Sequence, residues 1–279
     1  MDKKVSIIMG YYNRKSLLIN TLNQFNNLYK DYKLEVVIAN DKSNDNNKLD
    51  DIIKDYNFKI ILLDIIEKNW VNPCVAYNLA IRHISSDVEI VIIQNPEIYH
   101  LTNILNTALE KTVEGQYLSF SVFSTESEEL SNLFITNPEE KINDILKNKK
   151  IKNIGRWYNH PIFRPCAFHF LNSIHINDLK KIGGFDNNYK DGIWYDDNEI
   201  LERIKSICNI NIINPDIENN IILGIHQFHP TMTNNIISKK INLTKFNKLK
   251  SDMKKNKNYN IYCDPYLDFK YEIKNNNIN

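Results

Sequence analysis

Short apolar runs alternate with amphipathic stretches along the first hundred residues of the chain. β-Branched residues dominate the runs, which is typical of buried strands, and the stretches between them repeat apolar residues every three or four positions, as helices do. The pattern predicts strands at residues 4–9, 34–39, 58–63 and 88–93, and helices at 15–28, 47–56 and 75–83. Strands that alternate with helices indicate an α/β fold with a doubly wound, mostly parallel sheet.

The second half of the chain is less regular. No internal repeat and no linker rich in Pro, Gly or Ser divides it, so we expect one domain over residues 1–235 and a basic helical appendage with a tail over 236–279. The pattern predicts helices at 102–111, 142–147 and 176–182, a helix from about residue 198, strands at 117–123 and 221–225, and a Lys-rich helix after residue 231.

Composition excludes several functional classes. Lys and Arg number 35 against 34 Asp and Glu, so the chain lacks the basic excess on which nucleic-acid binding rests. No apolar run approaches the roughly 18 to 20 residues of a membrane span, and the first residues lead into no signal-peptide segment, so we expect a cytoplasmic protein. The seven glycines form neither a G-x-G-x-x-G motif nor a P-loop. The four cysteines are widely spaced, which predicts free thiols rather than zinc or disulfide sites.

Doubly wound sheets bind ligands beyond the carboxyl ends of their strands, and polar segments follow the first two expected strands. Residues 10–14 read Gly-Tyr-Tyr-Asn-Arg, and residues 40–45 read Asn-Asp-Lys-Ser-Asn-Asp. These segments resemble the P-T-Y-N-R and D-D-G-S-x-D motifs of the inverting family 2 glycosyltransferases of the GT-A fold. The resemblance implies a nucleotide site, in which Tyr12 stacks on the base, Asp41 accepts a hydrogen bond from the base or ribose, and Gly10, Asn13 and Ser43 complete the pocket. An ordinary polar turn at 40–45 is the alternative.

The fourth expected strand leads into Gln94-Asn95-Pro96-Glu97, where the family carries its metal-binding D-x-D motif. This resembles a subset of the family with Asn-Pro-Glu at that place, and it implies donor contacts from Gln94 and Asn95 and a metal contact from Glu97. Mn²⁺ and Mg²⁺ both accept carboxylate and diphosphate oxygens. Upstream, Asn78 matches the family's A-R-N motif and is expected to bind the donor, but Tyr77 replaces its Arg. Any role of that Arg near the phosphates must pass to another cation. A strand followed by an Asn-Pro turn is the alternative.

Residues 182–186 and 196–203 resemble the family's I-G-G-F-D motif and its downstream acidic pair. In the family the second acid of the pair is the catalytic base, which implies that role for Asp197, with Asp196 as its support or as an acceptor contact. Inverting transfer requires one carboxylate to take the proton of the acceptor hydroxyl. An acidic first turn of a helix would also produce this pattern, and the two interpretations are compatible.

Two histidines follow the last expected strand. GT-A enzymes often supply a metal ligand from this region, which favours His226, with His229 as the other candidate. The aromatic residues near the base segment can stack on a sugar, although such residues also occur in cores. The expected acceptor contacts are Trp157, His160, Gly184 and Trp194.

The resemblance spans about residues 4–230 and implies a nucleotide-sugar half at about 1–115 and an acceptor and base half at about 116–235. It implies a metal-dependent inverting glycosyltransferase that moves a sugar from a nucleotide-diphosphate donor, expected to be a UDP-sugar, to a hydroxyl of a glycan or glycoconjugate, as in polysaccharide biosynthesis. A catalytically silent nucleotide-sugar or glycan-binding protein is the alternative, because the first carboxylate of D-x-D and the Arg are missing. The presence of Glu97 and Asp197 favours the enzyme. Nucleotidyl transfer is disfavoured, because the Gly-rich phosphate signature is absent.

Overall fold

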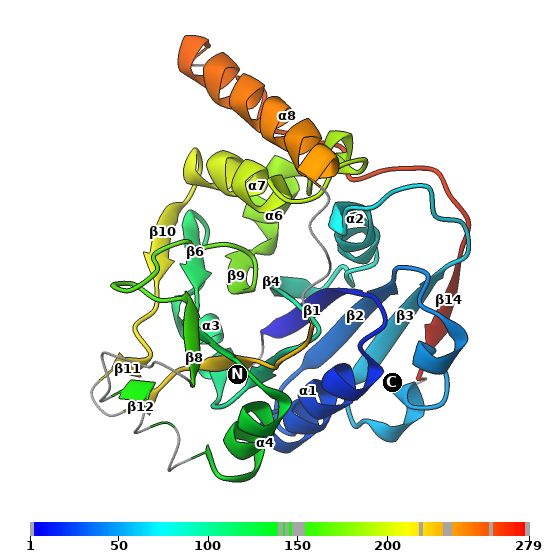
Figure 1. Ribbon diagram of the computed structural model, residues 1–279, viewed down its shortest axis with the longest axis vertical. Helices are drawn as coiled ribbons and strands as arrows, with labels where there is room; N and C mark the ends of the chain where they lie inside the picture. The colour runs from blue at the N-terminus through cyan, green and yellow to red at the C-terminus, as the bar shows by residue number, and fades with distance from the viewer. Residues whose placement is uncertain are drawn as a thin grey trace.

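A central β-sheet organises the chain (Figure 1). The structure is a computed structural model that describes residues 3–138, 142, 145–146, 154–217, 220–230, 236–256 and 259–276. Within these residues, eight strands form the sheet in the order β10-β6-β9-β4-β1-β2-β3-β14. They are β1 (Lys4–Tyr11), β2 (Leu34–Asn40), β3 (Lys59–Ile65), β4 (Val88–Gln94), β6 (Gln116–Ser119), β9 (Leu171–His175), β10 (Asn209–Ile212) and β14 (Tyr271–Asn275).

The four strands expected in the first hundred residues form the parallel centre of this sheet. β1 lies between β2 and β4, and β3 extends the sheet beyond β2, all in parallel register. β9 runs antiparallel between β4 and β6. The chain therefore leaves β1 on one side through β2 and β3 and returns on its other side at β4. This reversal places the segments that follow β1 and β4 at the point where α/β sheets bind ligands.

Helices cover both faces of the sheet, which explains the continuous apolar runs of its strands. Alternate residues of β1 face opposite ways: Ile7 and Met9 join a core under α1 (Lys15–Leu28) and α3 (Ile104–Lys111), whereas Ile8 joins a core under α2 (Cys74–Arg82). α6 (Ile176–Ile182) and α7 (Asp196–Lys205) share the second core, and Figure 1 shows them on the same side as α2.

A smaller mixed sheet lies beside the central one. In the described residues it has four strands in the order β5-β13-β7-β8. β13 (Gly224–His226) pairs antiparallel with β5 (Ile98–His100), and this register sets His226 opposite Ile98. The other two strands of this sheet are β7 (Val122–Thr125) and β8 (Gly155–Asn159). The helix α4 (Glu128–Thr136) packs on the sheet. A hairpin of β11 (Asp216–Ile217) and β12 (Asn220–Ile221) precedes β13.

The C-terminal segment differs from the expected appendage. α8 (Ile236–Lys255) packs against α7 and extends away from the domain (Figure 1). The chain then returns, and β14 pairs antiparallel with β3. The last described residues thus complete the central sheet. Their alternating, half-polar sequence suits an edge strand with one side in solvent, and such a short pattern gives only a weak sequence signal.

Three other expected elements differ from the structure. Residues 47–56 form no α-helix: two 3₁₀ turns, η1 (Asp45–Asn47) and η2 (Ile53–Asp55), lie in this region, where Asn and Asp side chains compete for backbone groups. The expected strand 117–123 divides between the two sheets as β6 and β7, and the strand 221–225 divides into β12 and β13. Half of the expected helix 142–147 lies outside the described residues.

Two simpler expectations are confirmed among the described residues. The four cysteines, all of which are described, are free thiols. Among the described helices, none combines the length and apolar character needed to cross a bilayer.

Candidate functional site

Glu97, His226 and His229 form a compact cluster at the point where the two sheets meet. Glu97 is buried in the turn after β4, and its Oε1 lies 3.3 Å from His226 Nε2 and 3.5 Å from His229 Nε2. Backbone pairing fixes the cluster, because the Gln227 N–H donates to the Glu97 carbonyl. Glu97 Oε2 and His226 Nε2 are buried without a hydrogen-bond partner among the described residues. One carboxylate, two imidazoles and unpartnered ligand atoms fit a divalent transition-metal ion.

Arg14 completes this cluster, and the sequence analysis did not select it. Its Nη1 lies 2.6 Å from Glu97 Oε1, and its side chain stays 30% exposed, whereas Glu97 is 1% exposed. Burial by itself raises the pKa of Glu97, but the two histidines and Arg14 outweigh burial and hold that pKa well below its usual value. Glu97 is therefore an anion at neutral pH. Arg14 directly follows the Tyr-Asn pair beyond β1, and this position could have identified it as a site residue from the sequence.

Tyr77, expected from the sequence to stand where the family motif carries Arg, lies between the metal cluster and a second group of ionisable residues. Its hydroxyl donates to the Gln94 carbonyl at 3.1 Å and contacts Asn95 Oδ1 at 3.0 Å. Asn95 in turn donates to Glu97 Oε1 at 3.3 Å. The ring of Tyr77 packs edge-on against His169, a residue of the second cluster. Tyr77 thus spans the distance between the two groups of ionisable residues.

The second cluster contains Asp196 and Asp197 at the start of α7. Asp196 is buried and accepts a hydrogen bond from Asn72 at 2.9 Å, and burial, followed by the charge of Asp197, raises its pKa to about 6. Asp197 is more open, with 26% of its side chain exposed, and its Oδ1 lies 2.5 Å from His169 Nδ1. The preceding residues, Trp194 and Tyr195, have φ angles of 65° and 66°. Such backbone costs about 1 to 2 kcal/mol per residue and is concentrated at functional sites.

The loops after β1 and β2 form the third part of the site. The ring of Tyr12 is 42% exposed, and Lys68 Nζ lies 4.8 Å from its centre. Lys68 also contacts Asp41 Oδ2 at 2.7 Å, and Trp70 Nε1 donates to Asp41 Oδ1 at 2.9 Å. Burial raises the pKa of Asp41, opposed by Lys68. Sequence reasoning missed Lys68 and Trp70, because their connection to Asp41 exists only in the folded chain.

The loops after β1 and β2 are also hydrogen-bonded to each other. The Asn13 N–H donates to Ser43 Oγ at 2.9 Å, and the Asn44 N–H donates to Asn13 Oδ1 at 2.9 Å. Gly10, at the end of β1, lies against α2: a Cβ there would come within 3.4 Å of Ala76 Cβ and the Tyr77 ring. These contacts hold the exposed face of Tyr12 in a fixed position relative to Asp41.

Several expected site residues make structural hydrogen bonds. Gln94 Oε1, at the end of β4, contacts His100 Nε2, at the end of β5, at 2.7 Å. Asn78 pairs through its amide with both backbone groups of Phe185, and a Cβ on Gly184 would lie 2.5 Å from Asn78 Oδ1. Asn78 and Gly184 therefore brace the turn that precedes the acidic pair.

The expected acceptor residues divide into two groups. Trp157 is buried against Phe123, and His160 Nδ1 accepts two backbone N–H groups in a buried turn, where burial lowers its pKa to about 4. Trp194 is 47% exposed beside the acidic pair, with Lys239 Nζ 4.0 Å from its ring centre. Trp194 is thus the member of the group whose ring is open to a sugar.

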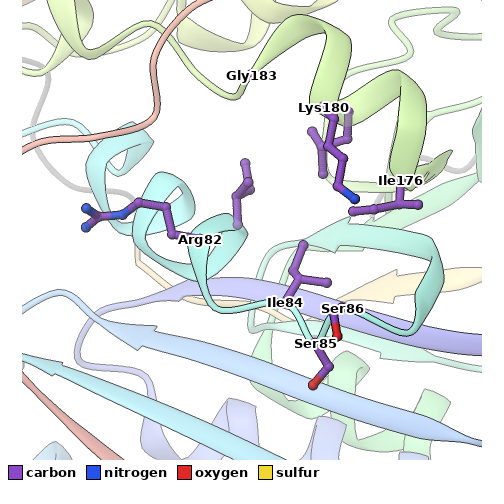
Figure 2. Close-up of a pocket in the computed structure, with 9 residues that line it drawn as sticks. Arg82, Ile84, Ser85, Ser86, Ile176, Lys180 and Gly183 are labelled. Atoms are coloured by element: carbon purple, nitrogen blue, oxygen red, sulfur yellow. The ribbon is translucent and has the colours of Figure 1, made fainter.

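Two cavities in the described residues lie outside the clusters. One of about 200 Å³ separates the end of α2 from α6, and Figure 2 shows Lys180 and Ile176 on one wall with Ile84 on the other, while Arg82 points away. The other, about 500 Å³, adjoins the loop after β2 and includes Ser43, Asp64 and Lys274 in its lining. The second cavity also includes the residues on either side of Asp41 in its lining, Asn40 and Lys42.

Several solved structures have a similar fold. The structure of GalNAc-T7 with UDP, GalNAc and Mn²⁺ matches with a TM-score of 0.57 at 12% identity, over 89% of this chain and 48% of that one. The catalytic domain of Drosophila beta1,4galactosyltransferase 7 with xylobiose matches with a TM-score of 0.50 at 11% identity, over 84% of this chain and 77% of that one. TarS of S. aureus matches with a TM-score of 0.51 at 14% identity, over 81% and 37%.

These identities show the fold alone, which is the GT-A fold of glycosyltransferases. No curated protein matches the chain. The sequence model described as glycosyl transferase family 2 matches residues 6–172, which is more than half of the chain. This range contains most of β1, all of β4 and the loops that hold Tyr12, Asp41 and Glu97. The chain belongs to glycosyl transferase family 2 and is a glycosyltransferase.

Proposed function

We propose that the chain is a metal-dependent inverting glycosyltransferase that moves a sugar from a UDP-sugar to a hydroxyl of a glycan or glycoconjugate. The observation that carries the proposal is the pair of clusters joined through Tyr77. On one side lie Glu97 and its two histidines, and on the other lies Asp197. A site for the leaving diphosphate and a site for the base are the two requirements of a single-displacement transfer.

The metal is assigned to Glu97, His226 and His229, whose ligand atoms lie within 4.8 Å of one another. Two imidazoles beside one carboxylate favour Mn²⁺ over Mg²⁺, because Mg²⁺ prefers oxygen ligands. A bound divalent cation would supply the positive charge that stabilises the leaving diphosphate. Similar solved structures contain Mn²⁺ with UDP and GalNAc, and manganese with UDP-Gal and xylobiose, which supports this assignment.

The donor is assigned to the surface formed by the loops after β1 and β2. The exposed face of Tyr12 suits stacking on a nucleobase, and Asp41 offers a hydrogen-bond acceptor beside it. Arg14 is assigned to the donor phosphates, because its guanidinium is partly exposed next to Glu97. It would thereby take over the role of the family Arg that Tyr77 replaces.

In the proposed reaction, Asp197 takes the proton of the acceptor hydroxyl. The acceptor oxygen then bonds to the anomeric carbon while the bond to the diphosphate breaks, and one displacement inverts the configuration. Asp196 supports the base from its buried position, and Trp194 is the proposed stacking surface for the acceptor. A silent nucleotide-sugar binder is the second candidate, favoured by the amide of Asn95 and by Tyr77 at the two motif positions.

The test of the donor and metal site is thermal unfolding with UDP, Mn²⁺ or both. A ligand that binds only the folded state raises its stability by mass action. We expect UDP and Mn²⁺ together to stabilise the wild type by more than the sum of their separate effects, and Glu97→Gln to abolish this excess. Glu89→Gln, an exposed change on β4, is the matched control and should keep it. An unchanged excess in Glu97→Gln would show that Glu97 does not bind the metal. The same measurement with GDP in place of UDP tests the base of the donor, and a larger stabilisation by GDP would assign guanine to it.

A further inference from the structure

His169 is a buried residue that none of the family motifs contains. It precedes β9, is 6% exposed, and its ring is held edge-on by two aromatic rings. The ring centres of Tyr77 and Phe185 each lie 4.9 Å from that of His169, at interplanar angles of 78° and 77°. Such packing fixes the direction in which the imidazole points and excludes water from its faces.

The imidazole faces the base. His169 Nδ1 lies 2.5 Å from Asp197 Oδ1, and this buried nitrogen has no other close partner among the described residues. The titratable groups around it are Asp196 and Asp197 of α7 and Tyr77 of α2. Tyr77 stays neutral, since burial raises its pKa well above the usual value. His169 is thus placed where a positive charge would meet two adjacent carboxylates.

We propose that protonated His169 is the positioning residue of the catalytic base, holding the Asp197 carboxylate toward the acceptor hydroxyl. The proposal rests on the proposed function, because it assumes that Asp197 is the base. Two neighbouring carboxylates repel each other, and Asp197 is the more exposed of the two, so without a cation it would turn toward solvent. The proton of the acceptor hydroxyl goes to Asp197 and the leaving electron pair goes to the diphosphate. His169 neither gives nor takes a proton in this step.

The charge state agrees with this role. Burial by itself lowers the pKa of His169, but the carboxylate of Asp197 outweighs burial, and the pKa of His169 is raised above its usual value of 6.5. The imidazolium therefore persists to a higher pH than that of an unperturbed histidine, and it is lost as the pH rises through the raised pKa. Activity should decline on the alkaline side as the positive charge disappears.

The first test needs no substrate. NMR titration of the imidazole signals, with His169→Asn to identify that of His169, should give a pKa above 6.5 in the wild type. Asp197→Asn should lower this pKa, because it removes the carboxylate that favours the charged ring. A wild-type pKa below 6.5, or a pKa that Asp197→Asn leaves unchanged, would overturn the proposal.

The second test uses turnover of UDP-galactose with Mn²⁺, followed by UDP release across pH. Asn keeps a donor near the place of Nδ1 but carries no charge, so His169→Asn should lower kcat by about 10- to 100-fold, leave KM for the donor nearly unchanged, and abolish the alkaline decline. The control is His175→Asn, at the other end of β9, where Asn can still cap α6. It should keep the wild-type profile.

The two failures are distinguishable. A wild-type alkaline limb retained in His169→Asn would overturn the positioning role while leaving Asp197 as the base. Normal turnover in Asp197→Asn would instead overturn the proposed function itself. Should His169→Asn fail to fold, the titration of the wild type and of Asp197→Asn still decides the proposal.

Discussion

At the scale of single residues, Asn95 and Tyr77 form one hydrogen-bonded chain with Glu97. Glu97 accepts from Asn95 and has two histidines and Arg14 as its other neighbours. Tyr77, which the motif resemblance sets where an Arg is expected, donates a hydrogen bond to Asn95 through its hydroxyl. The proposed metal site therefore contains one carboxylate and two imidazole ligands, and Arg14 is the nearby cation.

This arrangement predicts that both histidines bind the metal. Each lies within 3.5 Å of Glu97, so His226→Ala and His229→Ala should each raise the Mn²⁺ concentration for half-maximal stabilisation by UDP roughly tenfold or more. Thermal unfolding across a Mn²⁺ series measures the shift. His83→Ala is the control, because the His83 ring contacts the Leu79 carbonyl and the Tyr271 hydroxyl at the end of α2, and it should leave the midpoint in place. A normal midpoint in either test variant would remove that histidine from the site.

The residues that the motifs contain were predictable, and their partners were not. Glu97, Asp196 and Asp197 follow from short local patterns that recur in a fixed order. The contacts of these partners join residues that lie between 28 and 83 positions apart in the sequence, so no local pattern predicts them. They are the contacts of Arg14 with Glu97, Trp70 with Asp41 and His169 with Asp197. Trp157 was expected to contact the acceptor because of its aromatic ring, but the sequence does not reveal that this ring is buried against Phe123.

At the scale of elements, a buried network fixes the short strand β5 beside the metal cluster. His100 is fully buried, with its Nε2 2.7 Å from Gln94 Oε1 and its Nδ1 2.7 Å from the Tyr29 hydroxyl. Burial lowers the pKa of His100 to about 3, so the folded protein keeps this ring neutral. The network ties the turn after β4 to α1 and thereby positions Glu97.

This network predicts a loss of stability in acid. The unfolded chain protonates His100 below about pH 6.5, whereas the folded chain does not until about pH 3, so falling pH favours unfolding across this window. At pH 5, which is about 1.5 units below the pKa of His100 in the unfolded chain, this protonation lowers the free energy of unfolding by roughly 2 kcal/mol. Urea unfolding of the wild type and of His100→Leu at pH 7 and pH 5 measures it. His100→Leu should be less stable at pH 7 but lose less on acidification. An equal loss in both proteins would contradict the account.

The elements also show where periodicity is a sufficient guide. The helices at 15–28 and 176–182 have the expected bounds, because each has an amphipathic pattern and a defined face to bury. Residues 47–56 have the apolar spacing of a helix but are rich in Asn and Asp, and local side-chain bonds prevail there. β9 was not predicted, because its pairing between β4 and β6 is set entirely by distant strands.

At the scale of the whole molecule, the C-terminal segment reaches the nucleotide side of the fold. After α8 the chain returns along α2, and Phe269 packs against Trp70 with ring centres 4.8 Å apart (Figure 1). Trp70 donates to Asp41 in the proposed donor pocket. Lys274 of β14 contacts Asp64 of β3 at 2.6 Å at the edge of the neighbouring cavity. The segment expected to be an appendage thus supports the donor surface from behind.

Phe269→Ala should therefore weaken both stability and nucleotide binding. Loss of a partly buried aromatic side chain costs about 1 to 3 kcal/mol, and Trp70 would lose one wall of its site. Chemical unfolding and a UDP titration with Mn²⁺ measure the two effects. Ile273→Thr on β14 is the control, because Ile273 is 52% exposed and Thr also suits a strand. Destabilisation with unchanged UDP affinity would show that the C-terminal segment has no influence on the donor pocket.

The central claim is that Asp197 removes the proton of the acceptor. The most direct measurement is the transfer rate of Asp197→Asn at saturating donor and Mn²⁺, together with its donor affinity. Asn keeps the shape of the side chain but accepts no proton, so the rate should fall by a factor on the order of 10² to 10⁴ while donor binding persists. Asp196→Asn should cause a smaller loss. A turnover of Asp197→Asn close to that of the wild type would contradict the account.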